Sequence, residues 1–230
     1  EKRTLFFYRE RCRKYPINEN FFDKIDTRDK AYILGLLLAD GSKCSKVNQI
    51  RLALQERDKY ILESIKTIMG YDKPLNLKKK RYDHHQDQYC LIICNKKITL
   101  DLESHGIVNS KTYNISYPHG SVSDELFPDL LREILDGDGW FSQTGKQLTV
   151  GLVGRRSFLL DLKKKLQDLY NLDFFTREDK RLNPEFCSIR LRRKNDIIKL
   201  YHILYSDANL FLHRKKKTIE NYISKYDDNL

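Results

Sequence analysis

The chain has 230 residues, with 43 Lys and Arg against 32 Asp and Glu and a formal net charge of +11 at pH 7. That length can bury one large core or two smaller ones, and the excess of positive charge indicates a polyanionic partner. The sequence contains neither an apolar run long enough to cross a membrane nor a basic-then-apolar export signal, so we expect no membrane partner and no secretion.

The five cysteines do not have the spacing of a zinc ribbon or a disulfide framework. Their number is odd and no Cys-x-x-Cys pair occurs. Thiols in this pattern are typical of reduced cysteines. We therefore expect a reducing compartment.

The first half of the chain alternates helix-like and strand-like segments. Residues 30–39 predict an apolar helix that ends at Asp40-Gly41. Residues 50–54 alternate between apolar and polar side chains, which is the period of a half-buried strand. Further along the chain we expect a helix over 60–69, strands near 75–78 and 88–94, and a closing helix over 97–105.

The second half repeats this order of elements. Residues 127–137 predict a second apolar helix, which ends at Asp138-Gly139, 98 residues after the first Asp-Gly pair. Residues 148–152 again alternate, and leucines over 156–170 follow the 3.6-residue period of a helix. Strands over 174–177 and 186–192, a helix over 195–205 and a basic segment at 206–217 complete the repeat.

This order predicts an α+β fold made of two αββαββα units. Residues 112–126 contain Pro118, Gly120 and three Ser, which is typical of a linker. We expect a leader at 1–28, a first half at 29–111, that linker, and a second half at 127–230.

The two Asp-Gly pairs are the candidate functional feature. Asp at the C-terminal end of a helix faces the negative end of the helix dipole and does not stabilise it. A single Asp-Gly pair indicates an ordinary helix end, since Gly suits the position after a helix and Asp tolerates turns. Two copies at the same place in a repeated unit favour a functional role.

The segments ILGLLLADG at 33–41 and LREILDGDG at 131–139 resemble the paired signature of the LAGLIDADG homing endonucleases in their single-chain form. The resemblance covers nearly the whole chain. It implies a monomer with internal pseudo-twofold symmetry, in which antiparallel sheets form a saddle around two central signature helices. It also implies a site-specific endonuclease that cuts double-stranded DNA at a long target site and serves intron or intein mobility.

The resemblance implies the metal site as well. Asp40 and Asp138 match the acidic residues that bind divalent metal, normally Mg²⁺ or another cation such as Mn²⁺, and activate water against one phosphate of each strand. The carbonyls of Ala39 and Gly137 match additional ligands. The chemistry agrees, because hard oxygen ligands suit Mg²⁺ and close carboxylates favour a cation between them.

Three further residues match supporting roles in catalysis. The family places a basic residue after the closing helix of each half, near the scissile phosphate, where it stabilises developing charge. Lys111 and Lys215 occupy that place, although solvated surface is the alternative for lysine runs. Gln55 follows a strand toward the same site and is expected to hold water.

Strand alternation also selects a DNA-binding face. If the apolar side of each sheet packs on helices, the other side forms a polar, basic surface of the kind that reads base edges in the major groove. We expect the following residues to contact DNA: Arg51, Asn76, Lys78, Lys80, Thr149, Arg177, Ser188, Arg190 and Arg192.

One position departs from the signature. The third signature residue is usually small because the two helices approach closely; Gly35 follows that rule and Glu133 does not. A buried, unpaired Glu is costly. We therefore expect either a splayed crossing there or pairing with Arg132, Lys43 or another cation.

Two alternatives of other classes remain. A DNA-binding regulator or RNA-splicing maturase of the same fold would not cut DNA. The endonuclease part of an intein is the other alternative, although these residues carry no splicing chemistry; the stretch 1–28 resembles leader segments that join this fold to another domain. The expected location is an intracellular compartment that contains DNA: an organelle, the nucleus, or a bacterial or phage cytoplasm.

Overall fold

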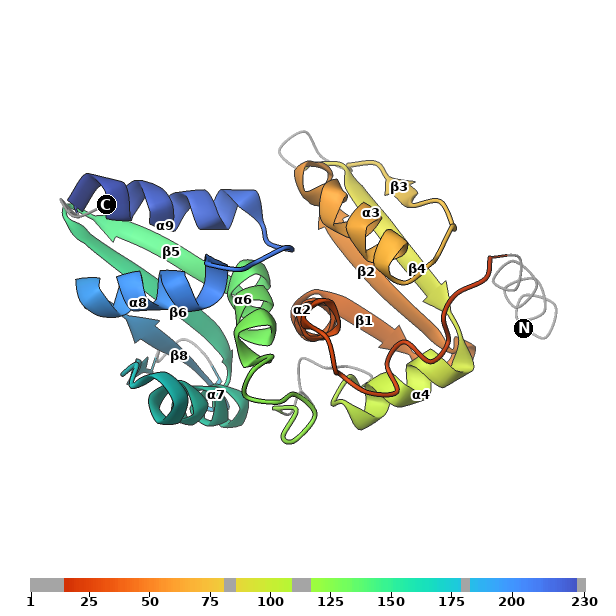
Figure 1. Ribbon diagram of the computed structural model, residues 1–230, viewed down its shortest axis with the longest axis horizontal. Coiled ribbons are helices and arrows are strands. Elements are labelled where there is room, and N and C mark those ends of the chain that lie inside the picture. Colours follow the sequence, from red (N-terminus) through yellow and green to blue (C-terminus); the bar gives the residue numbers. More distant parts are fainter. Residues whose placement is uncertain (1–14, 81–85, 109–116, 179–182, 227–230) are drawn as a thin grey trace.

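The computed structural model describes residues 15–80, 86–108, 117–178 and 183–226. Two halves lie on either side of a central pair of helices, α2 (Arg28–Ala39) and α6 (Phe127–Gly137), which pack against each other (Figure 1). Each half contributes its own four-stranded antiparallel sheet. The α+β fold expected from the repeated order of elements is confirmed.

The first half follows the expected order of helices and strands. After α2 its sheet is ordered β1-β2-β4-β3, so the two middle strands come from separate hairpin-like pairs. Helices α3 and α4 cover one face of this sheet (Figure 1). The elements are β1 (Gly41–Cys44), β2 (Gln49–Gln55), α3 (Lys59–Ile68), β3 (Asn76–Lys78), β4 (Gln88–Cys94) and α4 (Lys96–Ser104), with short 3-10 turns at Ser45–Val47 and Glu56–Asp58.

The second half repeats this topology with the sheet order β5-β6-β8-β7. It adds a helix, α9, where the sequence predicted only a basic segment. Buried Ile219, Tyr222 and Ile223 recur at three- and four-residue spacing among polar neighbours and give α9 its packed face. The elements are β5 (Gly139–Thr144), β6 (Gln147–Arg155), α7 (Arg156–Tyr170), β7 (Phe175–Arg177), β8 (Phe186–Leu191), α8 (Lys194–Tyr205) and α9 (His213–Tyr226).

The two sheets differ in how they are covered. Along β2, burial alternates residue by residue, with Ile50, Leu52 and Leu54 turned to the core as expected. Along β6, every residue from Leu148 to Leu152 is buried. Leu148, Val150 and Leu152 lie in the core as expected, but Thr149 and Gly151 between them are buried as well. The outer face of the second sheet is therefore partly covered.

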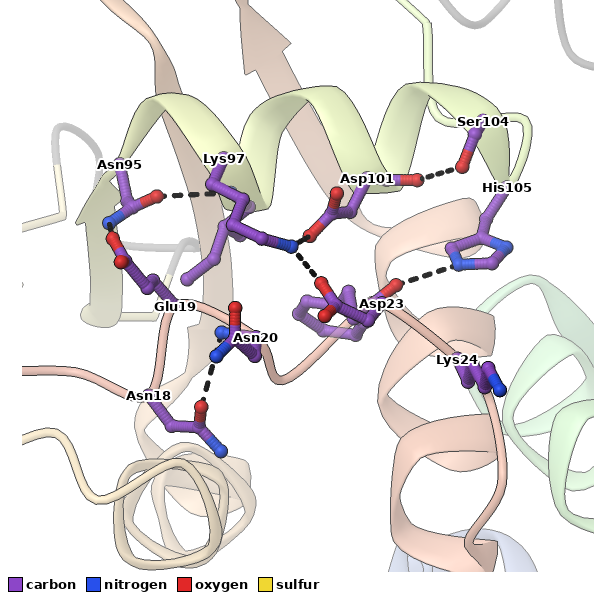
Figure 2. A network of polar contacts seen from close by, with 12 residues as sticks. Asn18, Glu19, Asn20, Asp23, Lys24, Asn95, Lys97, Asp101, Ser104 and His105 are labelled. Carbon is purple, nitrogen blue, oxygen red and sulfur yellow. Dashed lines mark hydrogen bonds and ion pairs between the residues drawn. The ribbon is translucent and has the colours of Figure 1, made fainter.

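The segment before α2 is part of the packed structure. Phe21, Phe22 and Ile25 are buried in the core, and the ring of His105, at the end of α4, contacts the carbonyl of Phe22 through Nε2 at 2.8 Å. Figure 2 shows Lys97 between two carboxylates, Asp23 from this segment and Asp101 from its own helix. Residues 15–27 thus join the core of the first half.

None of the helices in the described ranges combines the length and the apolar character needed to span a bilayer.

Candidate active site

The central helices end alike. Asp40 follows α2 with φ −106° and ψ −8°, and Asp138 follows α6 with φ −93° and ψ −10°. The backbone N–H of Asp40 donates to the Leu36 carbonyl at 2.8 Å, and that of Asp138 donates to the Ile134 carbonyl at 3.1 Å. Both Asp side chains belong to exposed residues. The two candidate carboxylates therefore have matching backbone geometry and open on solvent.

The glycine after each Asp is required by close packing. A Cβ on Gly41 would lie 2.5 Å from the carbonyl oxygen of Leu37. A Cβ on Gly139 would lie 2.9 Å from the carbonyl carbon of Leu135, with the oxygen nearer still. Neither glycine has positive φ. Each strand therefore begins in direct contact with the last turn of its helix. The glycine is needed for this close contact and not for a turn, which is the role that a single Asp-Gly pair would indicate.

The two helix ends touch. A Cβ on Gly137 would lie 2.6 Å from the Cβ of Ala39 and 3.5 Å from Oδ2 of Asp40. The carboxylate of Asp40 thus reaches the last residue of α6, immediately before Asp138. The structure brings together all four residues that the signature predicts as metal ligands.

Lys215 lies at the end of α6. Its ammonium donates to the carbonyls of Leu135 (3.5 Å) and Gly139, and it stands 5.1 Å from the ring centroid of Phe141. Burial, with Arg214, lowers the pKa of Lys215, while nearby carboxylates that include Asp138 oppose that shift. A cation at this helix end is favourable, because the exposed carbonyls there carry partial negative charge.

Buried charged side chains on α6 bind the α8–α9 connection, the segment that leads to Lys215. Asp136 accepts hydrogen bonds from the hydroxyl of Tyr205 (2.9 Å) and the backbone N–H of Leu212 (2.7 Å). Burial raises the pKa of Asp136 to about 6, and these hydrogen bonds act against that rise. Arg132 donates to the carbonyls of Leu204 and Leu210, each at 2.7 Å. These contacts fix the α8–α9 connection on the signature helix, a role that the sequence did not predict.

Glu133 contradicts both expectations for this position. The crossing is close, because a Cβ on Gly35 would lie 2.9 Å from the Cβ of Glu133. The predicted partners are engaged elsewhere: Arg132 pairs with Asp129, and Lys43 pairs with Glu103 at 2.9 Å. Glu133 is 0% exposed, and neither carboxyl oxygen makes a hydrogen bond of good geometry among the described residues. Burial, with Asp136, raises the pKa of Glu133 well above its usual range. The Tyr32 hydroxyl on α2 lies close enough to act against this rise in the pKa.

The other two catalytic predictions are Gln55 and Lys111. Gln55 ends β2 opposite Gln88, and its Oε1 is buried without a hydrogen-bond partner in the described part of the chain. That oxygen is a buried acceptor, which a water molecule would satisfy. Lys111 lies outside the described residues.

The DNA-facing predictions divide into exposed and covered residues. Arg51, Asn76 and Lys78 lie on the face of the first sheet opposite the buried side chains of β2, as the strand register shows. Lys80 is exposed just beyond β3. Arg177, Arg190 and Arg192 lie on or beside the outer face of the second sheet.

Two of these predictions require correction. Thr149 is 8% exposed and Ser188 is 4% exposed. The hydroxyl of Ser188 accepts from Nε of Arg190 at 3.2 Å and donates to the carbonyl of Arg177 at 3.3 Å. Both residues are on the expected face, but other side chains cover that face, so neither is placed to touch a base.

The oxygen atoms at the two helix ends suit a hard cation such as Mg²⁺, with substrate oxygens as additional ligands. Within the described ranges, no group of three or more His, Cys, Asp and Glu could hold a metal ion. Mg²⁺ does not need such a cage, since it is commonly bound by one or two carboxylates with water and substrate phosphates. Two exposed carboxylates at touching helix ends, with backbone carbonyls beside them, match that requirement.

A scan against protein-family models and a search of curated proteins both found no match. Solved structures do match. The meganuclease I-SmaMI bound to uncleaveable DNA superposes with a TM-score of 0.55 and 14% identity, over 84% of this chain and 88% of that chain. The I-LtrWI LAGLIDADG homing endonuclease bound to target DNA gives 0.56 and 15%, over 91% of each chain.

Full-length DUF199/WhiA from Thermatoga maritima also matches, with a TM-score of 0.53 and 15% identity over 90% of this chain and 64% of that chain. These similarities show the fold. The chain has the fold of single-chain LAGLIDADG homing endonucleases, as the paired signature predicts.

Proposed function

We propose that this protein is a site-specific, divalent-metal-dependent endonuclease that cuts both strands of a long DNA target. The observation that carries the proposal is the pair of matched helix ends. Asp40 and Asp138 have the same backbone conformation, are exposed, and are brought together by the contact between Ala39 and Gly137. One carboxylate from each half serves one scissile phosphate.

Double-stranded DNA is the partner that the surface supports. The net charge is +11, and Arg51, Lys78 and Arg177 lie on the outer faces of the two sheets. Solved relatives of this fold include I-SmaMI and I-LtrWI bound to DNA. A basic, strand-based surface of this kind fits the major groove.

The residues of the site have separate roles in the proposed reaction. Asp40 and Asp138 hold the metal, and the carbonyls of Ala39 and Gly137 supply further oxygen atoms. A bound Mg²⁺ or Mn²⁺ supplies an activated water and polarises the phosphate. Lys215, held at the end of α6, stabilises negative charge that develops on the phosphate of its half.

A protein of this fold that binds nucleic acid without cutting, as a regulator or a splicing maturase, is the second candidate. Glu133 is the observation that favours it, because a buried carboxyl between the signature helices departs from the cleaving pattern. Retention of both exposed carboxylates favours cleavage. The proposal also includes a role in intron or intein mobility and a compartment that contains DNA.

The test is a selection of cleaved sites from a randomised double-stranded DNA library with Mg²⁺. The native chain is compared with Asp40→Asn and Asp138→Asn, which keep side-chain shape and remove charge. Sites cut on both strands only by the native chain would support the endonuclease. If all three proteins bind the same DNA and none cuts it, the non-cutting candidate replaces it.

A further inference from the structure

The connection between α8 and α9, residues 206–212, extends toward the first half of the chain (Figure 1). There it meets Tyr60, near the start of α3. The Tyr60 hydroxyl donates a hydrogen bond to the carbonyl of Phe211 at 2.9 Å and accepts one from the backbone N–H of His213 at 2.9 Å. The rings of Tyr60 and His213 also pack together, with their centroids 4.7 Å apart. A single side chain of the first half therefore binds the backbone of the second half at two points.

The hydroxyl of Tyr60 serves the first turn of α9. The first N–H groups of a helix have no acceptor within that helix, and Tyr60 supplies an acceptor for His213, where α9 begins. Burial raises the pKa of Tyr60 to about 12. The hydroxyl therefore keeps its proton at neutral pH, and it can donate to Phe211 while it accepts from His213. Tyr60 thus caps a helix that belongs to the other half.

An ion pair lies beside this cap. Nε of Arg214 donates to Oδ2 of Asp58 at 3.1 Å. Asp58 is 4% exposed and directly precedes α3, where the positive end of the helix dipole favours a carboxylate. Because a buried carboxylate that loses its partner is costly, this pair resists separation. The contacts of Asp58 and Tyr60 with residues 211–214 together make up the inter-half contact.

Lys215 directly follows the inter-half contact in the chain. Its backbone N–H donates to the carbonyl of Leu212 at 2.9 Å, and the N–H of Leu212 donates to Asp136 on α6. The Lys215 ammonium donates to the carbonyl of Leu135, which is also on α6. The start of α9 is therefore held on one side by its own half and on the other side by the first half. The position of the ammonium at the end of α6 depends on both.

The residues that make the inter-half contact are not repeated in the second half. Positions 56 and 156 match, because the backbone N–H of each donates to the carbonyl of the residue directly before a strand, β4 at 3.0 Å and β8 at 2.7 Å. Asp58 therefore corresponds to Phe158, and Tyr60 corresponds to Leu160. The side chains of Phe and Leu form neither ion pairs nor hydrogen bonds. The polar contact is thus a feature of one side of the molecule.

We propose that Asp58 and Tyr60 are positioning residues for Lys215, through which the first half controls cleavage of the DNA strand that Lys215 serves. The inference rests on the proposed function, since it concerns the rate of cleavage. A displacement of about 1 Å at a reacting group can lower a rate by about 100-fold. Loss of the inter-half contact should slow that strand alone, because α9 presents Lys215 to one strand only.

The test follows the two strands of one duplex separately. The duplex selected by the native chain carries a different fluorophore on each strand and is cut in Mg²⁺ with protein in excess. Lys215→Met identifies the strand that Lys215 serves, since that strand should be the one it slows. We expect Tyr60→Phe and Asp58→Ala to slow the same strand by about 10- to 100-fold, so that nicked duplex accumulates. The rate on the other strand, and the affinity for the duplex in EDTA, should stay unchanged.

Two further variants assign the effect to the inter-half contact. Glu63→Ala removes a carboxylate from the same helix, but that carboxylate pairs with Lys59 and Lys66 of α3 itself, so the rates on both strands should be kept. Arg214→Gln removes the partner of Asp58. In the Arg214→Gln background, Asp58→Ala should slow cleavage no further, because the effects of two residues that act through one contact are not additive.

The outcomes separate this inference from the proposed function. Nicked product from Tyr60→Phe and Asp58→Ala, with the strand of Lys215 left uncut, supports the positioning role. If the variants slow both strands alike, slow the other strand, or cut as the native chain does, the positioning role is wrong and the endonuclease proposal stands. If the native chain cuts no duplex, both are wrong. Tyr60→Phe keeps the ring, so the strand comparison can be made with it even if Asp58→Ala does not fold.

Discussion

Gly35 on α2 faces Glu133 on α6 where the central helices cross, and a Cβ on Gly35 would lie 2.9 Å from the Cβ of Glu133 and 2.8 Å from the carbonyl oxygen of Leu130. The backbones can approach this closely because one of the two facing residues has no side chain. The absence of a side chain at Gly35 therefore makes room for the larger residue on α6, and the pseudo-symmetry of the signature is broken without separating the helices.

Gly35→Ala should therefore destabilise the protein. Ala is the better helix former by about 1 kcal/mol, but its methyl group would press on a backbone oxygen that cannot move alone. We expect a net loss of about 1–3 kcal/mol in the free energy of unfolding, measured by urea denaturation. An unchanged or raised stability would show that the helices can separate at this point. Lys164→Ala, at an exposed helical site, is the control and should change stability by less than about 0.5 kcal/mol.

Glu133→Met should stabilise the protein. Both carboxyl oxygens of Glu133 are buried without a hydrogen bond of good geometry in the described ranges, and the Tyr32 hydroxyl lies beside them. An unsatisfied buried polar group costs about 1–3 kcal/mol, and Met, of similar volume, would remove that cost. Burial raises the pKa of Glu133 in the folded state above its usual 4.5, so folding favours the protonated form. The native residue is then least unfavourable below that usual value, and its cost grows as the pH rises.

Urea denaturation of the native chain and of Glu133→Met at about pH 5 and about pH 8 measures this dependence. The advantage of the variant should be larger at the higher pH. An equal advantage at both values would show that Glu133 does not titrate between folded and unfolded states, and a loss of stability would show that its carboxylate has a partner.

The repeated order of elements was predictable because each half carries its own periodicity. Residues Ile50, Leu52 and Leu54 turn to the core as alternation requires, and α7 buries Leu159, Leu162 and Leu166 as the helical period requires. Helix α9 was missed because its apolar residues are few and lie among lysines. The sequence pattern of an element predicts which of its faces is apolar. It does not predict which other part of the chain packs against the opposite face.

The candidate site likewise contains residues that the sequence predicted and residues that it did not. The signature predicted that Asp40 and Asp138 follow the two central helices, and they do, because these positions depend on local chain order. The contact of Lys215 with the end of α6 joins residues 80 positions apart and had no such local signal. Burial of Thr149 and Ser188 could not be predicted from strand alternation, since it depends on a face that is covered from outside the strand. The buried contacts of Asp136 join residues 69 and 76 positions apart, for which a single sequence holds no signal.

The segment before α2 should contribute strongly to stability through its aromatic side chains and weakly through its ion pairs. Phe22 is 0% exposed, so Phe22→Ala should cost about 3–5 kcal/mol. The side chain of Lys97 is 39% exposed beside Asp23 and Asp101, and Lys97→Ala should cost less than about 1 kcal/mol. Chemical denaturation of the two variants tests the contrast. Similar losses would mean that the polar network shown in Figure 2 contributes as much as the core to the attachment of this segment.

Lys215→Met should separate cleavage from binding. The ammonium donates to carbonyls at the end of α6, within electrostatic reach of Asp138, where it would act on charge that develops during the reaction. We expect the single-turnover cleavage rate to fall by about 10²–10³-fold with only a small change in affinity for the same duplex. A fall in affinity with an unchanged rate would assign Lys215 to binding instead. Lys216→Met, one residue further along α9, is the neighbouring control and should keep the rate.

The far end of the second half should supply affinity without sequence preference. A surface hollow of about 650 Å³ is lined by Lys146, Lys225 and the run 192–194, with two tyrosines. Lys146 and Lys225 are exposed, and cations at such a place neutralise backbone phosphates rather than read bases. Replacement of both by Ala should weaken binding to every duplex alike. Because each phosphate contact contributes about 0.9 to the slope of log K against log salt concentration, the slope should become shallower by about 1.8.

Lys164→Met, at an exposed position on α7, is the matched comparison for this measurement, because it removes one positive charge elsewhere in the same half. Its slope should equal that of the native chain. The double alanine variant should show an altered slope with unaltered base preference. A changed preference in the double variant would place Lys146 or Lys225 at base edges, and an unchanged slope would mean that DNA does not reach the hollow. Titration of fluorescent duplexes at several salt concentrations measures both quantities in one experiment.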